Sequence, residues 1–208
     1  MLARLRILRK NPLVDLLVTL VTAVVIAYLV QLFVVKPFRV PSESMEPTLM
    51  AGDRIIAVRF LLHFTDPQRG EILVFHPNGH GNDVFRSQTV ADPYYVKRLI
   101  GLPGETVGSH NGRVWICSQS APANLAEPQA TPGCRYLNEP YTHSLPTYSL
   151  INYGQDLEPT RLGPDQYFMM GDNRTNSADS REWGAIRRTQ IVGQAFMTYW
   201  PISRISFY

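Results

Sequence analysis

Residues 94–105 read YYVKRLIGLPGE, and this stretch shows the pattern that decides the fold. Its first seven residues have the length of a β-strand and are rich in the aromatic and β-branched side chains that strands favour. Leu102-Pro103-Gly104 would end that strand in a turn. Because side chains alternate between the two faces of a strand, Tyr95, Lys97 and Leu99 share one face. We therefore expect a strand that carries a lysine among apolar neighbours.

Similar short apolar runs recur after residue 37, separated by breakers such as Asp66-Pro67 and Pro77-Asn78-Gly79. Their lengths and compositions predict strands at Arg54–Val58, Glu71–Phe75, Tyr94–Ile100, Arg113–Ile116, Gln166–Met170 and Ile191–Tyr199. This part of the sequence shows no sustained helical spacing. A chain of 208 residues is long enough to bury a core, so we expect a mostly β domain over residues 36–208.

The longest apolar run, Leu13–Val35, precedes these strands and reads LVDLLVTLVTAVVIAYLVQLFVV. It has 23 residues, and a helix that spans a bilayer needs about 20. A cleaved secretory signal has a shorter apolar region, of roughly 7–15 residues, and a small-residue cleavage site that this run lacks. A buried core helix is the other alternative, but four bases lie just before the run and no such cluster follows it. We therefore predict a cytoplasmic basic tail over residues 1–12 and a transmembrane helix over residues 13–35.

The net charge of +3 reflects this tail rather than the remainder of the chain. Arg4, Arg6, Arg9 and Lys10 lie in the tail, and without them 16 bases face 17 acids. The remainder has no basic excess that would attract nucleic acid, and we expect no such partner. The ordinary apolar content of 45% also excludes an intrinsically disordered chain. Only three of the 20 bases are lysines, and Lys97 is the one that does not flank the apolar run.

Residues 117–164 differ from the strand-rich remainder, because they are rich in Pro, Ser, Thr, Ala and Asn. We interpret them as an excursion from the sheets. Both cysteines, Cys117 and Cys134, lie in this excursion, and thiols on the exported side of a membrane tend to be oxidised. A disulfide is one interpretation, and two unpaired buried thiols are the other.

None of the five histidines stands in a pattern that indicates catalysis or metal binding. His76 and His80 are four residues apart, but Pro77 and Gly79 between them predict a turn rather than a helix that would align them. Two cysteines without matching histidine spacing do not indicate a structural zinc site. We expect no metal and no cofactor.

Two further segments hold many polar side chains. Pro41–Leu49 (PSESMEPTL) carries Ser42 and Ser44, whose hydroxyls would point to one side of an extended stretch. Gly171–Arg181 (GDNRTNSADSR) holds two Asp, two Arg, two Asn and two Ser after a buried-looking strand. A polar linker and an ordinary surface loop are the simpler interpretations. Polar groups that bond to one another would instead form a rigid support for a site.

Lys97 also has two interpretations. A lysine exposed on a strand is the usual case. A lysine buried among apolar side chains is desolvated, which disfavours the ammonium and lowers its pKa from about 10.4. The neutral amine could then accept a proton near neutral pH.

In this order after one N-terminal span, these segments resemble the type I signal peptidases, Ser/Lys endopeptidases that remove signal peptides. The box Ser-x-Ser-Met-x-Pro-Thr-Leu is matched by Ser42–Leu49, and Gly-Asp-x-(apolar)-Val-Phe is matched loosely by Gly70–Phe75, with Glu71 in place of Asp. Tyr-x-Lys-Arg…Gly-x-Pro-Gly-(Asp/Glu) is matched by Tyr95–Glu105, and Gly-Asp-Asn-Arg-x-x-Ser-x-Asp-Ser-Arg by Gly171–Arg181. The resemblance covers roughly residues 35–199 and is to the single-span group of the family. The excursion matches nothing specific.

The resemblance implies a mostly β fold, in which a transmembrane helix precedes a catalytic domain of coiled antiparallel β-sheets. Ser44 would be the nucleophile, and Lys97 would be the general base. The Ser44 backbone N–H and the Ser42 hydroxyl would form the oxyanion hole.

Further residues would support the dyad and bind the substrate. Ser177 would orient the amine of Lys97, and Asp179 would pair with Arg181 to hold that region. Small pockets that select small residues at the first and third positions before the cut would be lined by Val40, Met45, Leu49, Tyr95 and Val96. The substrate would add a strand beside the catalytic one. Glu43 stands where some members have glycine, and we expect its side chain to point away from the site.

The expected partners are signal peptides of exported preproteins, cut at A-x-A-like sites, and the lipid bilayer, close to the protein export machinery. The membrane would be the plasma membrane or an internal one such as the thylakoid. Tyr199-Trp200 is either an interfacial element or the end of a core strand. Two alternatives stay open: a membrane-anchored binding protein of the same fold whose peptidase site has decayed, and a related Ser/Lys protease that cleaves itself in the cytosol.

Overall fold

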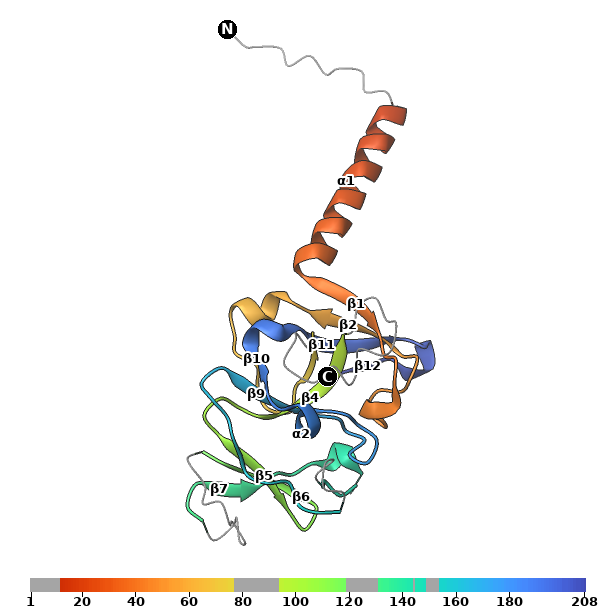
Figure 1. Cartoon of the computed structure of the whole chain (residues 1–208). Helices are drawn as coiled ribbons and strands as arrows, with labels where there is room; N and C mark the ends of the chain where they lie inside the picture. The colour runs from red at the N-terminus through yellow and green to blue at the C-terminus, as the bar shows by residue number, and fades with distance from the viewer. Residues whose placement is uncertain (1–11, 77–93, 119–130, 144, 149–153) are drawn as a thin grey trace.

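The computed structural model of the chain describes residues 12–76, 94–118, 131–143, 145–148 and 154–208. A long helix, α1 (Pro12–Phe33), leads into a body built almost entirely of antiparallel strands (Figure 1). A second helix, α2 (Ser180–Trp183), has a single turn, and several 3-10 turns connect strands. The expectation of a mostly β fold is therefore confirmed.

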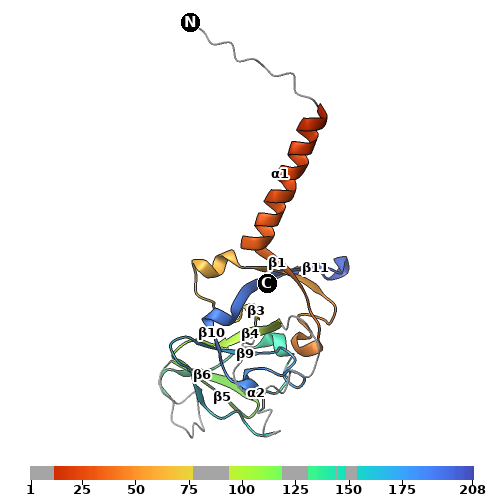
Figure 2. The ribbon, with the colours of Figure 1, turned by 45° about the horizontal axis from the view of Figure 1, so that its top comes forward.

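α1 has 22 residues and stands clear of the sheets (Figure 2). Its side chains are described as far as Tyr28, and up to that point all are exposed. Val34 alone separates the helix from the first strand. Among the residues that the structure describes, no helix is long and apolar enough to cross a membrane. The transmembrane helix over residues 13–35 therefore stays a prediction.

Eight strands form the main sheet, in the order β1-β2-β11-β3-β4-β9-β10, with β12 paired to the end of β11. All of these pairs are antiparallel. The strands are β1 (Val35–Arg39), β2 (Arg54–Val58), β3 (Ile72–Phe75), β4 (Tyr95–Gly101), β9 (Gln166–Met170), β10 (Ile186–Arg187), β11 (Ile191–Trp200) and β12 (Ser206–Phe207).

A smaller sheet forms the end of the body farthest from α1 (Figure 1). Its strand order is β7-β6-β5-β8. These strands are β5 (Thr106–His110), β6 (Arg113–Cys117), β7 (Cys134–Tyr136) and β8 (Thr160–Arg161). Cys117 and Cys134 lie opposite each other in the β6–β7 pair and form a disulfide. Where the structure describes residues 117–164, they include two short strands, β7 and β8, and a 3-10 turn, Pro140–Thr142.

Each of the six expected runs coincides with a strand, and β2 and β9 have the expected bounds. Other strands were missed for physical reasons. β7, β8, β10 and β12 have only two or three residues, which is too short for an alternating pattern to appear. β5 contains Gly108, which strands disfavour, but Trp115 of β6 packs where a side chain at 108 would lie.

The pairing of β4 with β9 brings distant segments together. Met170, the last residue of β9, lies opposite Arg98 of β4. The chain therefore leaves β9 at Gly171 beside the strand that carries Lys97. The turn that follows β1 lies in the same region, because the Asn173 backbone N–H donates a hydrogen bond to the Ser44 carbonyl.

Candidate active site

The turn after β1 carries Ser44. Glu43–Met45 form a 3-10 turn, and Ser42 before it is extended, at φ −139° and ψ 167°. The Ser42 hydroxyl donates a hydrogen bond of 3.2 Å to Ser44 Oγ. The two hydroxyls meet as expected, but through a tight turn rather than along an extended stretch. Ser42 is exposed, whereas Ser44 is buried.

Lys97 lies in the middle of β4, opposite Leu73 of β3. Its side chain is buried, with 3% of its surface exposed, so the interpretation as an exposed strand lysine is wrong. The Lys97 amine donates a hydrogen bond of 2.6 Å to Ser44 Oγ. A buried amine and a buried hydroxyl, 53 residues apart in sequence, thus form a direct pair.

Burial lowers the pKa of Lys97 to about 8, because the protein interior disfavours the ammonium. The negative charge of Asp179 opposes this shift, the positive charge of Arg181 adds to it, and the negative charge of Asp172 opposes it again. With a pKa of about 8, about a tenth of the amines are neutral at pH 7. A neutral amine beside a hydroxyl can take its proton, which is the chemistry of an activated nucleophile.

Gly171 forms the contact between the loop Gly171–Arg181 and the serine turn. A Cβ at this position would overlap with the Ser44 carbonyl oxygen and with the Ser177 side chain. The next segment of the loop holds the same carbonyl, since the Asn173 backbone N–H donates to Ser44 O over 3.1 Å. Only a residue without a side chain fits at 171 while these groups keep their positions.

Asp179 is the centre of this loop, and its carboxylate is completely buried. It accepts hydrogen bonds from the Ser177 hydroxyl at 2.8 Å, the Gly171 N–H at 2.9 Å and the Arg181 guanidinium at 2.8 Å from two nitrogens. Burial alone would raise the pKa of Asp179, but the hydrogen bonds and charge of Arg181 outweigh it and hold that pKa below its ordinary value. The loop therefore satisfies its own polar groups, as a rigid support would.

The structure brings most of the expected site residues together. Ser42, Ser44 and Lys97 form one hydrogen-bonded group, and the Ser177 hydroxyl lies against Gly171, next to the Ser44 carbonyl. The Ser177 hydroxyl donates to Asp179, and the hydrogen bond described for the Lys97 amine goes to Ser44 rather than to Ser177.

Four of the five expected pocket residues share one apolar cluster with residues of β2 and β3: Val40, Met45, Leu49 and Val96. Tyr95 lies apart from them. It packs against a second cluster and stacks on Phe75, with ring centroids 6.1 Å apart. Neighbouring residues of β4 thus face different clusters, as the alternation of a strand requires.

Glu43 is exposed and is hydrogen-bonded to the loop Gly171–Arg181, which we call the support loop. Its backbone carbonyl accepts from the Asn173 amide at 3.2 Å, and its carboxylate accepts from the Asn176 amide at 3.3 Å. Its side chain therefore lies along the loop Gly171–Arg181. Among the described residues, no three His, Cys, Asp or Glu side chains gather in a way that could hold a metal ion, and His80 lies outside those residues.

The sequence reasoning did not single out the pairing of Arg98 with Asp172. Arg98 donates from Nε and Nη2 to the two oxygens of that carboxylate, at 2.8 and 2.6 Å. Thr48 donates to the same carboxylate over 2.5 Å. These bonds tie β4, the serine turn and the support loop to one another. The signal was present, because Thr48 and Asp172 fall inside the two polar segments and Arg98 directly follows Lys97 in the predicted strand.

Comparisons with known proteins identify the family of this chain. The family described as "Signal peptidase, peptidase S26" matches residues 13–200. "Probable signal peptidase I-2" of Synechocystis sp. is 36% identical over 94% of this chain and 77% of its own length, and "Signal peptidase I" of Leptolyngbya laminosa is 36% identical over 94% and 83%. "Signal peptidase I P" of Bacillus subtilis subsp. natto is 31% identical over 95% of this chain and 94% of its own. The chain therefore belongs to the signal peptidase family, peptidase S26, and is a signal peptidase I.

Proposed function

We propose that this chain is a membrane-anchored endopeptidase that removes signal peptides from exported preproteins by a Ser/Lys dyad. The observation that carries the proposal is the 2.6 Å hydrogen bond between the buried Lys97 amine and Ser44 Oγ. The alternative of a decayed binding protein is opposed by this intact pair. The relatives, all named as signal peptidases I, oppose the alternative of a self-cleaving cytosolic protease.

In the proposed mechanism, Ser44 Oγ attacks the scissile carbonyl while the neutral Lys97 amine takes the hydroxyl proton. The resulting ammonium gives this proton to the leaving amine, which departs with the mature protein. The signal peptide remains as an ester on Ser44. A water molecule, deprotonated by Lys97, then attacks the ester, and the Lys97 ammonium returns that proton to Ser44 Oγ as the signal peptide leaves.

The developing oxyanion requires hydrogen-bond donors that are already in position. Ser42 is suited to this role, because its hydroxyl lies 3.2 Å from Ser44 Oγ and the residue is exposed. The Ser44 backbone N–H would be the second donor. Removing one such donor typically lowers the rate about 10²–10³-fold.

Ser177 and Asp179 would act after the first proton transfer. Because the Ser177 hydroxyl donates its proton to Asp179, its lone pairs stay available to accept from an ammonium. Ser177 could therefore orient the charged form of Lys97, while Arg181 keeps Asp179 ionised. This supports the positioning roles that the resemblance implies.

The substrate would bind as an added strand beside β4. β3 pairs with Tyr95–Lys97 on one side, whereas β9 pairs with β4 only from Arg98 onward. In the described part of the chain, the other edge of Tyr95–Lys97 thus has no strand partner, and backbone groups there could bond to an extended peptide. Small residues before the cut would face the cluster of Val40, Met45, Leu49 and Val96, and the role of Tyr95 stays a prediction.

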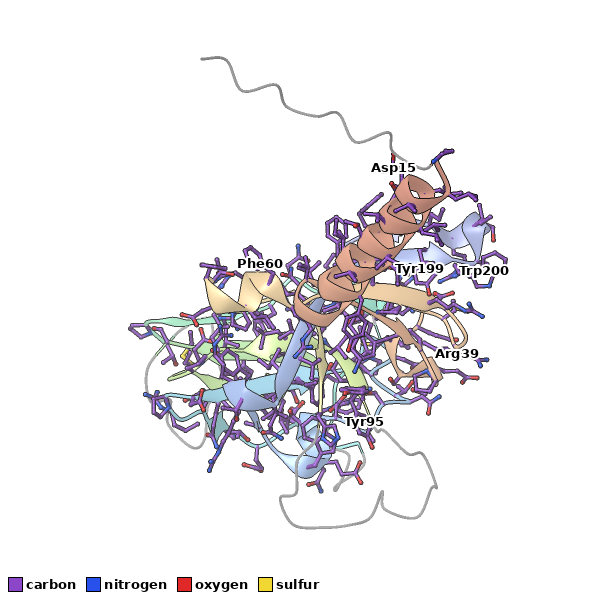
Figure 3. The ribbon with its side chains drawn as sticks, turned by 90° about the horizontal axis from the view of Figure 1, so that it is seen from above. Asp15, Arg39, Phe60, Tyr95, Tyr199 and Trp200 are labelled. Atoms are coloured by element: carbon purple, nitrogen blue, oxygen red, sulfur yellow. A yellow bond between two sulfur atoms is a disulfide. The ribbon has the colours of Figure 1, made fainter. Side chains whose placement is uncertain are left out.

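The anchor would be α1, with the catalytic domain on the exported side of the plasma membrane or of an internal membrane such as the thylakoid, near the export machinery. Exposed apolar side chains near the base of the helix support close contact with lipid. Figure 3 shows Phe60 and Trp200 on either side of α1. Trp200 is 49% exposed, which favours the interfacial interpretation of this strand end. Phe64, in ring contact with Phe60, is exposed as well, and so are Ile202 and Ile205, which follow Trp200 in the chain.

The test is cleavage of a peptide that carries an A-x-A site, with purified full-length chain in detergent. Ser44→Ala and Lys97→Ala should each abolish cutting, and Lys97→Arg should fail as well because a guanidinium cannot act as a base. Ser206→Ala, at an exposed serine of β12, is the matched control and should cut like the parent. Replacing the alanine before the cut by phenylalanine should abolish cleavage. Full activity in the Ser44 and Lys97 variants would refute the dyad.

A further inference from the structure

The excursion, which resembles nothing specific in sequence, contacts the support loop of the site. Glu139 follows β7 by three residues and lies just before the 3-10 turn Pro140–Thr142. We propose that Glu139 is a positioning residue, which holds Arg174 and, through it, the part of the support loop that packs on Ser44. This inference rests on the proposed function and names an additional residue on which the same site depends.

Arg174 is almost completely buried, at 1% exposure, and each of the three nitrogens of its guanidinium donates a hydrogen bond. Its Nη2 and Nη1 donate to the two carboxylate oxygens of Glu139, at 2.6 and 3.1 Å. Nη1 also donates to Thr147 Oγ1 at 2.6 Å, and Nε donates to the Gly171 carbonyl at 2.9 Å. Glu139 and Thr147 both belong to the excursion. Two of the three residues that accept hydrogen bonds from this guanidinium thus lie outside the sequence motifs that resemble the family.

The hydrogen bond from Arg174 to Gly171 connects Glu139 to the Ser44–Lys97 pair. Arg174 holds the carbonyl side of Gly171, and Asp179 holds its N–H at 2.9 Å. Gly171 is therefore fixed on both sides. Because Gly171 lies directly against the Ser44 carbonyl and Ser177, a displacement of Gly171 would move both serines relative to Lys97.

A second contact from the same segment supports the assignment independently. The Arg98 guanidinium lies over the Tyr141 ring, with Arg98 Cζ 4.0 Å from the ring centroid. Arg98 also forms the ion pair with Asp172. The Tyr141 hydroxyl donates to Glu139 Oε1 at 2.9 Å. Glu139 and Tyr141 therefore contact two arginines, Arg174 of the loop Gly171–Arg181 and Arg98 of β4, which pairs with Asp172 of that loop.

We expect the site to depend on Glu139, because the buried Arg174 guanidinium cannot be solvated by water where it lies. Removing one member of a buried ion pair leaves an uncompensated charge, whereas removing both is often tolerated. Without Glu139, the Arg174 guanidinium would move toward water or toward Asp179, and in either case its bond to Gly171 would be lost. An error of about 1 Å in such a site can lower a rate about 100-fold.

The experiment compares Glu139→Ala and Glu139→Gln with Glu158→Ala in the full chain, by kcat, KM and thermal melting. Glu158 is an exposed glutamate of the same excursion and is the matched control. Glu139→Ala should lower kcat between about 10- and 100-fold with little change in KM, at a temperature where melting shows the protein fully folded. Glu139→Gln keeps one acceptor oxygen and should lose less. Glu158→Ala should behave like the parent.

A double variant, Glu139→Leu with Arg174→Met, separates positioning from stability. It removes both charges, so its melting temperature should lie close to that of the parent, but it cannot hold the Gly171 carbonyl. Its kcat should therefore stay low. A parental kcat in this folded variant, or in folded Glu139→Ala, would overturn the inference. Ser44→Ala and Lys97→Ala are assayed alongside: if these two retain activity, the proposed function fails, and if they are inactive, only the role of Glu139 is in question.

Discussion

At the scale of single residues, the site depends on one amine kept in an environment that disfavours its charge. The ordinary pKa of a lysine side chain is 10.5, and burial lowers that of Lys97 to about 8. In the proposed dyad, only the neutral amine can accept the proton of Ser44. We expect kcat/KM for peptide cleavage to rise about tenfold per pH unit below pH 8 and to level off above it. A pH–rate profile from pH 6 to 9.5 measures this, and a profile that is flat over this range would contradict the role of Lys97.

The same shift predicts a stability effect of defined sign. Lys97 is harder to protonate in the folded state than in the unfolded state. The free energy of unfolding is therefore highest above pH 10.5, where Lys97 is neutral in both states. It falls as the pH is lowered toward the folded pKa of about 8. At pH 7 the buried ammonium therefore costs about 3 kcal/mol, partly offset by its hydrogen bond. Lys97→Met should raise the free energy of unfolding by about 1–3 kcal/mol at pH 7, and this gain should vanish near pH 10.5.

Urea denaturation of both proteins at the two pH values checks this expectation. Lys36→Met is the comparison, because the Lys36 amine bonds to the Tyr94 hydroxyl and lies over its ring, contacts that a methionine loses. It should bring no gain in stability at pH 7. A Lys97→Met variant that is less stable than the parent at pH 7 would contradict a net cost of burying the Lys97 ammonium.

At the scale of elements, the site is built where the end of β9 meets the turn after β1. Gly171→Ala should place a Cβ into the Ser44 carbonyl and the Ser177 side chain, one of which must move. We expect kcat to fall about 100-fold or more and the melting temperature to fall as well. Gly163→Ala is the control and should be mild in both measurements, because a Cβ there would come no closer than 3.2 Å to any neighbour, the side-chain oxygen of Gln166. Equal activity of the two variants would argue against close packing at Gly171.

The disulfide affects a different element, the edge of the smaller sheet. It closes a loop with a sequence separation of 17, which in the chain-entropy model contributes about 3 kcal/mol. Cys117→Ser with Cys134→Ser should therefore lower the melting temperature by about 6–12 °C. β7 would still pair with β6 through Tyr136 and Arg135, so kcat at low temperature should stay near that of the parent. A parental melting temperature in this variant would show that the disulfide does not stabilise the fold.

These elements also show what a sequence can and cannot predict. The alternating pattern of 94–105 was sufficient to place β4, because its strand is long and ends at a Pro-Gly turn. The same pattern could not decide whether Lys97 was exposed, since both faces of β4 turn out to be covered. The meeting of Ser44 with Lys97 depends on pairings across the sheet that no local pattern encodes. Only the order of the polar segments, through the family resemblance, indicated it.

Glu139 is a residue whose role could not be predicted from the sequence. It lies in a segment whose composition predicts an irregular excursion, and irregular segments carry no period from which burial can be inferred. Its importance comes from a long-range ion pair with Arg174, 35 residues away. Such a pair becomes visible only in three dimensions.

At the scale of the whole molecule, a body of packed sheets follows directly on an exposed helix. β1 begins at Val35, so the domain starts where α1 ends, and the Ser44 turn follows within ten residues of that strand's start. If α1 is embedded in a bilayer, the dyad is held close to the lipid surface. A substrate whose apolar signal segment lies in the same bilayer would then meet the dyad without leaving the membrane.

We therefore expect the full chain to remain in the membrane fraction after alkaline carbonate extraction. Charged replacements at three exposed positions of α1, Val18→Arg, Val21→Arg and Val25→Arg together, should release it into the supernatant, because each arginine costs about 2.5–3.5 kcal/mol at the centre of a bilayer-spanning helix. The matched control replaces the same three valines by leucine and should stay membrane-bound. Because the described side chains of α1, up to Tyr28, are all exposed, the released variant should still cut an A-x-A peptide while it cuts a membrane-embedded preprotein poorly. Release of the leucine variant, or retention of the arginine variant, would contradict anchoring by α1.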